Sequence, residues 1–281
     1  MVFNRHRLSD LVGVFTVFLI LAGFCQLTAA NEAFPLDIST AESRRIGVRI
    51  FQNECGGNPA RLVSWNSHED FMSLGIGHFI WYPQGVAKSY RESFPLLVRY
   101  LSANGVPPPA AAVVPDGGIA ACPWPDRGAF EADRRGPAAK ALRHYLETTL
   151  DGQVNFMLHR LAAARNDILT AAPAADRPRV ERQFARMART PMGRYALVDY
   201  VNFKGEGLLP EERINGQGWG LLQVLLEMDP DEGLNDPLKA FSAAADRVLT
   251  RRAEADTRPH VKEEWLPGWR RRLATYLEPR L

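Results

Sequence analysis

Apolar residues recur at helical spacing through the second half of this sequence, from Pro137 to the end. Successive stretches place Leu, Val, Ile, Phe and Met three or four residues apart, which is the spacing of one helix face. Amphipathic helices bury their apolar faces by packing against other elements around a core. We therefore expect a mainly helical domain, with helices over residues 137–150, 151–170, 176–189, 191–202, 216–227, 236–255 and 262–277.

Residues 1–30 have the pattern of a secretory signal. A basic start at Arg5-His6-Arg7 is followed by an apolar run from Leu11 to Phe24 and by small residues at Thr28-Ala29-Ala30, where a signal peptidase would cut. The apolar run is shorter than the roughly 20 residues that span a bilayer. We expect a periplasmic or secreted protein whose residues 31–281 form a single globular domain. The alternative is an uncleaved segment that tethers the chain to a membrane.

The charge balance argues against one broad class of partner. The chain has 34 Lys and Arg against 32 Asp and Glu, a formal net charge of +2. Nucleic-acid-binding domains present a strongly basic surface, so no nucleic-acid partner is expected. Two local Arg clusters, Arg182 to Arg189 and Arg270 to Arg272, are interpreted as solvated helix faces. The alternative is contact with an anionic polymer. Histidines are scattered singly and no close cysteine pair occurs, so neither a metal site nor a cofactor is expected.

The first half of the mature chain mixes helices with short strands. A helix is predicted to start near Thr40 and to end near Glu54, because Gly56-Gly57 stops it. A strand is expected over residues 62–65 and a polar turn over 66–70. Residues 71–78 are expected to form a returning strand or a loop, and residues 89–101 a further short helix. The fold class is therefore α+β, mainly α.

Residues 105–128 are rich in Pro and Gly and are expected to form a long surface loop of the domain. Cys122 lies in this loop, and Cys55 lies at the end of the first predicted helix. A disulfide between them is plausible in an oxidising compartment. The alternative is two free, buried thiols.

One pair of motifs carries chemical information. Glu54 lies at a predicted helix end, and the following segment contains Ser73-Leu74-Gly75-Ile76-Gly77-His78. This arrangement resembles the lysozyme-like superfamily, and most closely the phage-type lysozymes, in which a catalytic Glu ends a helix and a β-hairpin ends in Thr-x-Gly-x-Gly-His. The resemblance covers residues 45–82 and implies a lysozyme-like helical domain with a small β-hairpin beside a cleft.

The resemblance also implies roles for individual residues. Glu54 would be the general acid that protonates a glycosidic oxygen, a role favoured by a hydrophobic wall that raises the pKa of a carboxyl group. Ser73 matches the Thr of the family pattern. The family's Asp position falls on Ser67, which is a departure, and Glu69 or Asp70 can replace it if the hairpin is longer. Hydrolysis and a lytic transglycosylase route, which needs mainly one acid/base Glu, therefore both stay open.

Five further residues are candidates for substrate binding, and each has a structural alternative. His78 either bonds the hairpin backbone or contacts the substrate, and Trp81 and Tyr82 either belong to the core or stack on a sugar ring. Glu206, flanked by glycines, is a reserve carboxylate, and its alternative is a surface ion pair with Lys204. The stretch Gly220-Leu221-Leu222-Gln223 is similar to the Gly-Leu-Met-Gln element of lytic transglycosylases, which implies that Gln223 lines the cleft. The alternative is close helix packing.

The sequence thus predicts an exported enzyme that cleaves a β-1,4-linked amino-sugar polymer, most naturally peptidoglycan. A second hypothesis is a non-catalytic, cell-wall-binding or accessory protein with a degenerate lysozyme-like fold. The expected partner is the glycan itself, and membrane contact is expected only through the N-terminal segment if that segment is not cleaved.

Overall fold

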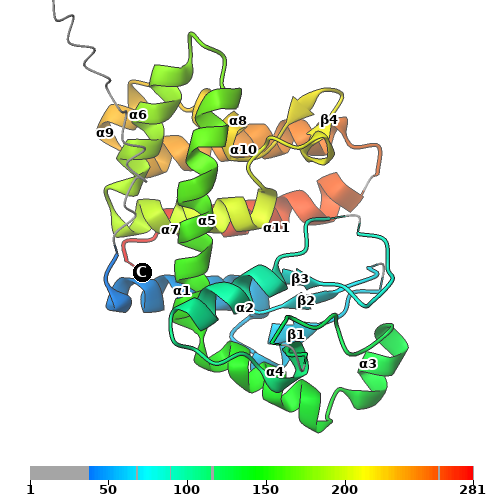
Figure 1. Cartoon of the computed structure of the whole chain (residues 1–281). Coiled ribbons are helices and arrows are strands. Elements are labelled where there is room, and N and C mark those ends of the chain that lie inside the picture. Colours follow the sequence, from blue (N-terminus) through cyan, green and yellow to red (C-terminus); the bar gives the residue numbers. More distant parts are fainter. Residues whose placement is uncertain (1–37, 68, 89, 115–116, 259, 281) are drawn as a thin grey trace, which may run out of the picture. The chain divides into compact units, whose positions relative to one another are not determined.

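The computed structural model describes residues 38–280 except 68, 89, 115–116 and 259 (Figure 1). The predicted export signal, residues 1–30, lies outside the described residues. The described part of the chain belongs to one compact unit. It is mainly helical with a small antiparallel sheet, which confirms the coarse fold class.

The first helix, α1 (Thr40–Cys55), starts and stops as the sequence predicts. The hydroxyl of Ser39 accepts a hydrogen bond from the Glu42 N–H at 3.2 Å and so caps the first turn. The helix ends because Gly56 adopts a left-handed conformation, φ 59°, in which its N–H can reach back to the last carbonyls. This ending leaves Glu54 in the last turn.

The sheet consists of β1 (Val63–Ser64), β2 (Met72–Leu74) and β3 (Phe79–Trp81), in that order and antiparallel. Ser64 pairs with Ser73 across β1 and β2. The first two strands confirm the predicted hairpin. The third was not predicted as a strand, because Phe79, Ile80 and Trp81 are all apolar and show no alternation of polar and apolar positions.

Ten further helices follow the first one in the described part of the chain. They are α2 (Phe94–Ala103), α3 (Arg127–Asp133), α4 (Pro137–Thr148), α5 (Leu150–Ala171), α6 (Arg177–Ala188), α7 (Pro191–Lys204), α8 (Leu221–Glu227), α9 (Glu232–Asn235), α10 (Pro237–Ala255) and α11 (Leu266–Ala274). The long helix α5 packs against α1, α2, α6 and α7, and Figure 1 shows it running from the region of the sheet toward α6. Among the described residues, no helix is both long and apolar enough to cross a bilayer.

Two predicted helices differ from the observed ones. The helix expected from residue 216 begins only at Leu221, because β4 (Arg213–Ile214) and β5 (Gln217–Gly218) form a tight hairpin instead. Asn215 and Gly216 both have positive φ, which is the Asn-Gly turn that favours two-residue hairpins. The helix expected over 262–277 is interrupted, with a π-helical turn before α11 and a 3₁₀ turn after it.

The Pro- and Gly-rich segment 105–128 is tied to the sheet. The Cys122 N–H donates to the Tyr82 carbonyl at 2.9 Å, and the Trp81 indole donates to the Ala120 carbonyl at 3.0 Å. Cys55 and Cys122 are free, buried thiols, which is the second of the two alternatives. Burial raises the pKa of Cys55 to about 11 and that of Cys122 to about 12, so both thiols stay protonated and unreactive near neutral pH.

A buried glutamine on α5 fixes the turn that follows β2. The Oε1 atom of Gln153 accepts from the Ile76 N–H at 3.0 Å, and its Nε2 atom donates to the Leu146 carbonyl at 2.6 Å. Gly75 packs directly on this side chain and has φ 67°, so a Cβ there would overlap Gln153 Oε1. The glycine is therefore required both by the backbone conformation and by the close approach of α5.

Gly75→Ala should lower the free energy of unfolding by more than the roughly 1–2 kcal/mol that a left-handed residue costs, because it also displaces Gln153. Urea unfolding followed by circular dichroism measures this. Gly85→Ala is the matched control, since Gly85 has φ 80° but nothing within 4 Å of the added Cβ. Equal losses in the two variants would contradict the proposed role of Gln153.

Candidate active site

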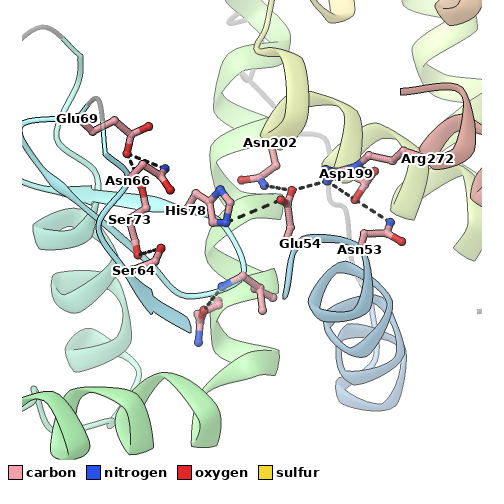
Figure 2. A network of polar contacts seen from close by, with 12 residues as sticks. Asn53, Glu54, Ser64, Asn66, Glu69, Ser73, His78, Asp199, Asn202 and Arg272 are labelled. Carbon is pink, nitrogen blue, oxygen red and sulfur yellow. Dashed lines mark hydrogen bonds and ion pairs between the residues drawn. The ribbon is translucent and has the colours of Figure 1, made fainter. Parts of the chain in front are cut away.

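Glu54 lies in a polar network at the end of α1. Its side chain is only 11% exposed. The Oε1 atom accepts from Arg272 Nη2 at 2.5 Å and from Asn202 Nδ2 at 3.2 Å (Figure 2). Two donors from α11 and α7 therefore hold the same oxygen, and the surroundings of Glu54 are polar rather than the hydrophobic wall that the sequence suggested.

The second oxygen of Glu54 faces His78. The distance from Glu54 Oε2 to His78 Nε2 is 3.9 Å, and Figure 2 shows the imidazole directed toward the carboxylate. His78 has φ 44°, a conformation that is uncommon for a residue with a side chain. Backbone strain of this kind persists where the surrounding structure imposes it, and here the bond from Ile76 to Gln153 fixes the preceding turn.

A second carboxylate, that of Glu69, is hydrogen-bonded to residues of the hairpin. Glu69 Oε2 accepts from Asn66 Nδ2 at 2.9 Å and from Ser73 Oγ at 3.3 Å (Figure 2). The Trp65 indole donates to the Glu69 carbonyl at 2.7 Å, which fixes the backbone at this point. Two of the residues that the sequence singled out, Ser73 and Glu69, are therefore in direct contact. No hydrogen bond or ion pair orients the neighbouring carboxylate, Asp70, within the described part of the chain.

These residues surround one cavity of about 740 Å³, which we call the hairpin cavity. Its polar lining is contributed by the hairpin and by α7. The members that matter for chemistry are Asn66, Glu69, Asp70, Ser73, His78 and Asn202, and Tyr82 and Tyr90 also line it. Glu54 is not a lining residue. It lies behind His78 and Asn202, both of which contact it and face the cavity.

Sequence reasoning missed the buried carboxylate that completes the network. Asp199 on α7 is fully buried and accepts from Arg272 Nε and Nη2, both at 2.8 Å, and from the Tyr276 hydroxyl at 2.7 Å. Burial alone lowers the pKa of Arg272, but Asp199 and Glu54 outweigh this effect and hold it well above its ordinary value. Arg272 is thus a permanent cation, and the prediction that it belongs to a solvated helix face is wrong.

For Trp81 and Gln223 the structure agrees with the structural alternative and not with a role in substrate binding. Trp81 is fully buried and bonded to the Ala120 carbonyl, so it belongs to the core and offers no ring face to a sugar. Gln223 accepts from the Gly220 N–H at 3.0 Å and donates to the Gly207 carbonyl at 3.1 Å. It is not among the residues that line the hairpin cavity, and these bonds fit the close-packing alternative.

Glu206, the reserve carboxylate, is also separate from the hairpin cavity. Burial raises its pKa, while Arg160 acts in the opposite direction. Its backbone N–H donates to Glu212 Oε1 at 3.1 Å. Within the described part of the chain, no three His, Cys, Asp or Glu side chains cluster as they would around a metal ion.

Asp199→Asn should lower the free energy of unfolding by about 3–5 kcal/mol, because it removes one partner of a buried charge pair. Urea unfolding measures this. Arg270→Gln on the same helix as Arg272 is the control, since Arg270 and its partner Asp246 are 51% and 41% exposed and such a pair contributes at most about 1 kcal/mol. A loss in Asp199→Asn as small as that of the control would show that the network does not stabilise the fold.

Comparison of the chain with protein-family models, with curated proteins and with solved structures gives no match. The interpretation of this site therefore depends on its geometry and on the resemblance of its motifs.

Proposed function

We propose that this chain is an exported, lysozyme-like enzyme that cleaves a β-1,4-linked amino-sugar polymer, most naturally peptidoglycan. The observation that carries the proposal is that His78 and Asn202, which line the hairpin cavity, also contact the carboxylate at the end of α1. Glu54 lies directly behind His78 at the edge of this cavity, and Glu69 and Ser73 line the cavity. Cleavage of a glycosidic bond requires a general acid and a second carboxylate that flank the bond.

Glu54 is the proposed general acid, and its two oxygens have different tasks. Oε1 is occupied by Arg272 and Asn202, which fix the plane of the carboxyl group. Oε2 has no such donor among the described residues and faces His78, which borders the hairpin cavity. A proton carried on Oε2 can therefore pass toward a glycosidic oxygen in the cavity once His78 or Asn202 moves aside.

Glu69 is the proposed second carboxylate. Breaking a glycosidic bond develops positive charge on the sugar ring, and a fixed carboxylate stabilises that charge or positions a water molecule. Asn66 and Ser73 hold the Glu69 carboxylate at the cavity, whereas Asp70 lacks such orienting bonds among the described residues. A preoriented group contributes more to catalysis than one that must first be ordered. Hydrolysis and transglycosylation are both compatible with this pair.

A second candidate function is glycan binding without cleavage. The observation that favours it is the ion pair between Glu54 and Arg272, together with the position of Glu54 behind the cavity lining. In such a protein Glu54 would stabilise the fold and the hairpin cavity would only bind sugar. Purified sacculi would then retain the protein and release no soluble fragments.

Glu54→Gln should reduce fragment release from purified sacculi by about 10²–10⁴-fold, because the amide oxygen can still accept from Arg272 and Asn202 but the side chain cannot deliver the proton. Mass spectrometry of the soluble products measures the rate and also separates hydrolysed from anhydro sugar ends. Glu147→Gln, at an exposed position on α4, is the control. If Glu54→Gln retains full activity, the assignment of the acid is wrong. If the unmodified chain binds sacculi and releases nothing, the binding function replaces the enzymatic one.

Glu69→Gln should lower the same rate strongly, whereas Asp70→Asn should leave most of it. The amide oxygen introduced at position 69 can still accept from Asn66 and Ser73, so the fold is expected to survive while the negative charge at the cavity is lost. The two rates, measured beside thermal unfolding curves, distinguish the carboxylates. If Asp70→Asn lowered the rate more than Glu69→Gln, Asp70 would be the second catalytic carboxylate instead of Glu69.

A further inference from the structure

A second cavity, which we call the Lys204 cavity, adjoins the hairpin cavity. Its volume is about 920 Å³, and Tyr90, Asn202 and Phe203 line both cavities. Its walls are aromatic, with three Trp side chains contributed by Trp219, Trp265 and Trp269. A ligand lying in the hairpin cavity can therefore extend past Phe203 into this second space.

Lys204, in the last turn of α7, lines this cavity without an anionic partner among the described residues. Its Nζ atom lies 3.7 Å from the ring centroid of Trp269 and 3.9 Å from that of Phe203. No carboxylate in the described part of the chain forms an ion pair with this ammonium group. Cation–π contacts stabilise an ammonium group only partly compared with water or a carboxylate, so this charge is under-compensated.

Arg252 on α10 is a second cation in the same wall. Its guanidinium carbon lies 4.2 Å from the ring centroid of Trp219 and 4.8 Å from that of Trp269. Its Nε atom is buried and has no hydrogen-bond partner in the described structure. Asp256 attracts this guanidinium electrostatically, but its carboxylate is bonded to Arg258 at 2.7 Å. A buried donor without an acceptor points to a missing acceptor group.

The other charged residues around the cavity do not supply that acceptor. Glu212 accepts from the backbone N–H groups of Glu206, Leu208 and Leu209, so its carboxylate is already occupied. Lys88 is bonded to Glu92 at 2.5 Å.

Arg91, a further lining residue, is also a cation. From the side of the polar network, Arg272 repels the Lys204 ammonium group and Glu54 attracts it. Among the described residues, the lining therefore presents several cations, of which Arg252 has an Nε–H without an acceptor. It presents one carboxylate, that of Glu212, which already accepts three backbone hydrogen bonds.

We propose that the Lys204 cavity binds a carboxylate on the peptide branch of the same glycan, with Lys204 and Arg252 as donors and the Trp rings against the apolar part of the branch. This inference rests on the proposed function, because the glycan in the hairpin cavity is what brings the peptide to the adjoining space. A guanidinium whose Nε–H has no acceptor matches a carboxylate, and the aromatic walls match a short organic chain better than a bare inorganic anion.

The proposal predicts a characteristic pH dependence. Burial, followed by repulsion from Arg252 and Arg272, lowers the pKa of Lys204 to about 6, with Glu54 acting in the opposite direction. A bound carboxylate favours the charged amine and raises this pKa, so binding takes up a proton. Affinity is therefore greatest below pH 6 and falls as the pH rises above 6, by about tenfold per pH unit at the limit where only the protonated amine binds.

The experiment is calorimetric titration of the whole chain with N-acetylmuramyl-L-alanyl-D-glutamate at pH 5.5 and pH 8. The same compound with both carboxyl groups amidated is the matched probe. We expect the carboxylate form to bind at least about tenfold more tightly at pH 5.5 than at pH 8, and more tightly than the amide at pH 5.5. Lys204→Met should remove the pH dependence, and Lys140→Met, at an exposed position on α4, should not.

Equal binding of acid and amide, or an unchanged pH dependence in Lys204→Met, would overturn the proposal. Binding of inorganic phosphate in place of the peptide probe would do the same, because it would identify a general anion site. The probe contains no glycosidic bond between two sugars, so its binding is measured independently of cleavage. A chain that binds the probe but releases no fragments from sacculi refutes the enzymatic function and leaves the carboxylate site standing.

Discussion

The arginine shared by Glu54 and Asp199 is the interaction on which the arrangement of the site depends. Arg272 is 10% exposed and its partners are 11% and 0% exposed, so none of the three charges can rely on water for compensation. An unpaired buried charge is costly. The charges on α1, α7 and α11 are therefore tolerated only when these three helices pack so that Arg272 reaches both carboxylates. The position of Glu54 is thereby determined by helices that are remote from it in sequence.

The hairpin is held in place by hydrogen bonds between uncharged groups. Gln153 reaches from α5 to the turn after β2, and Gly75 leaves the space that this contact needs. His78 then follows in a strained conformation that directs its ring toward Glu54. The two halves of the site are thus held separately, one by ion pairs and one by a neutral hydrogen bond.

The local features of this molecule could be predicted, because neighbouring residues determine them. The end of α1 at Gly56, the hairpin and most of the helices from α4 onward follow from caps, turn residues and helical periodicity. The role of Arg272 could not be predicted, since it stands in a run with Arg270 and Arg271 whose pattern is that of a solvated face. Only tertiary packing distinguishes the buried member of that run from its exposed neighbours.

The Asn-Gly turn before α8 is visible in the sequence, but the helical spacing of the residues after it favoured a longer helix. Gln223 illustrates a related difficulty. A short motif similarity suggested that it lines the cleft, whereas in the structure its side chain is hydrogen-bonded to the backbone of Gly207 and Gly220. Asp199 carried no signal at all, since a single acidic residue within an apolar helix is indistinguishable from a surface position until its partners are known.

The contact between Glu54 and Arg272 joins residues that are 218 positions apart. The turn of the hairpin needs Gln153 of α5, 77 positions after Ile76, and Glu54 acquires the cation that orients it only when α11 is present. Contacts of such long range form late, after the entropy of closing a long loop has been overcome. A chain that lacks α11 thus contains the sequence motif of the site but not the cation that orients Glu54.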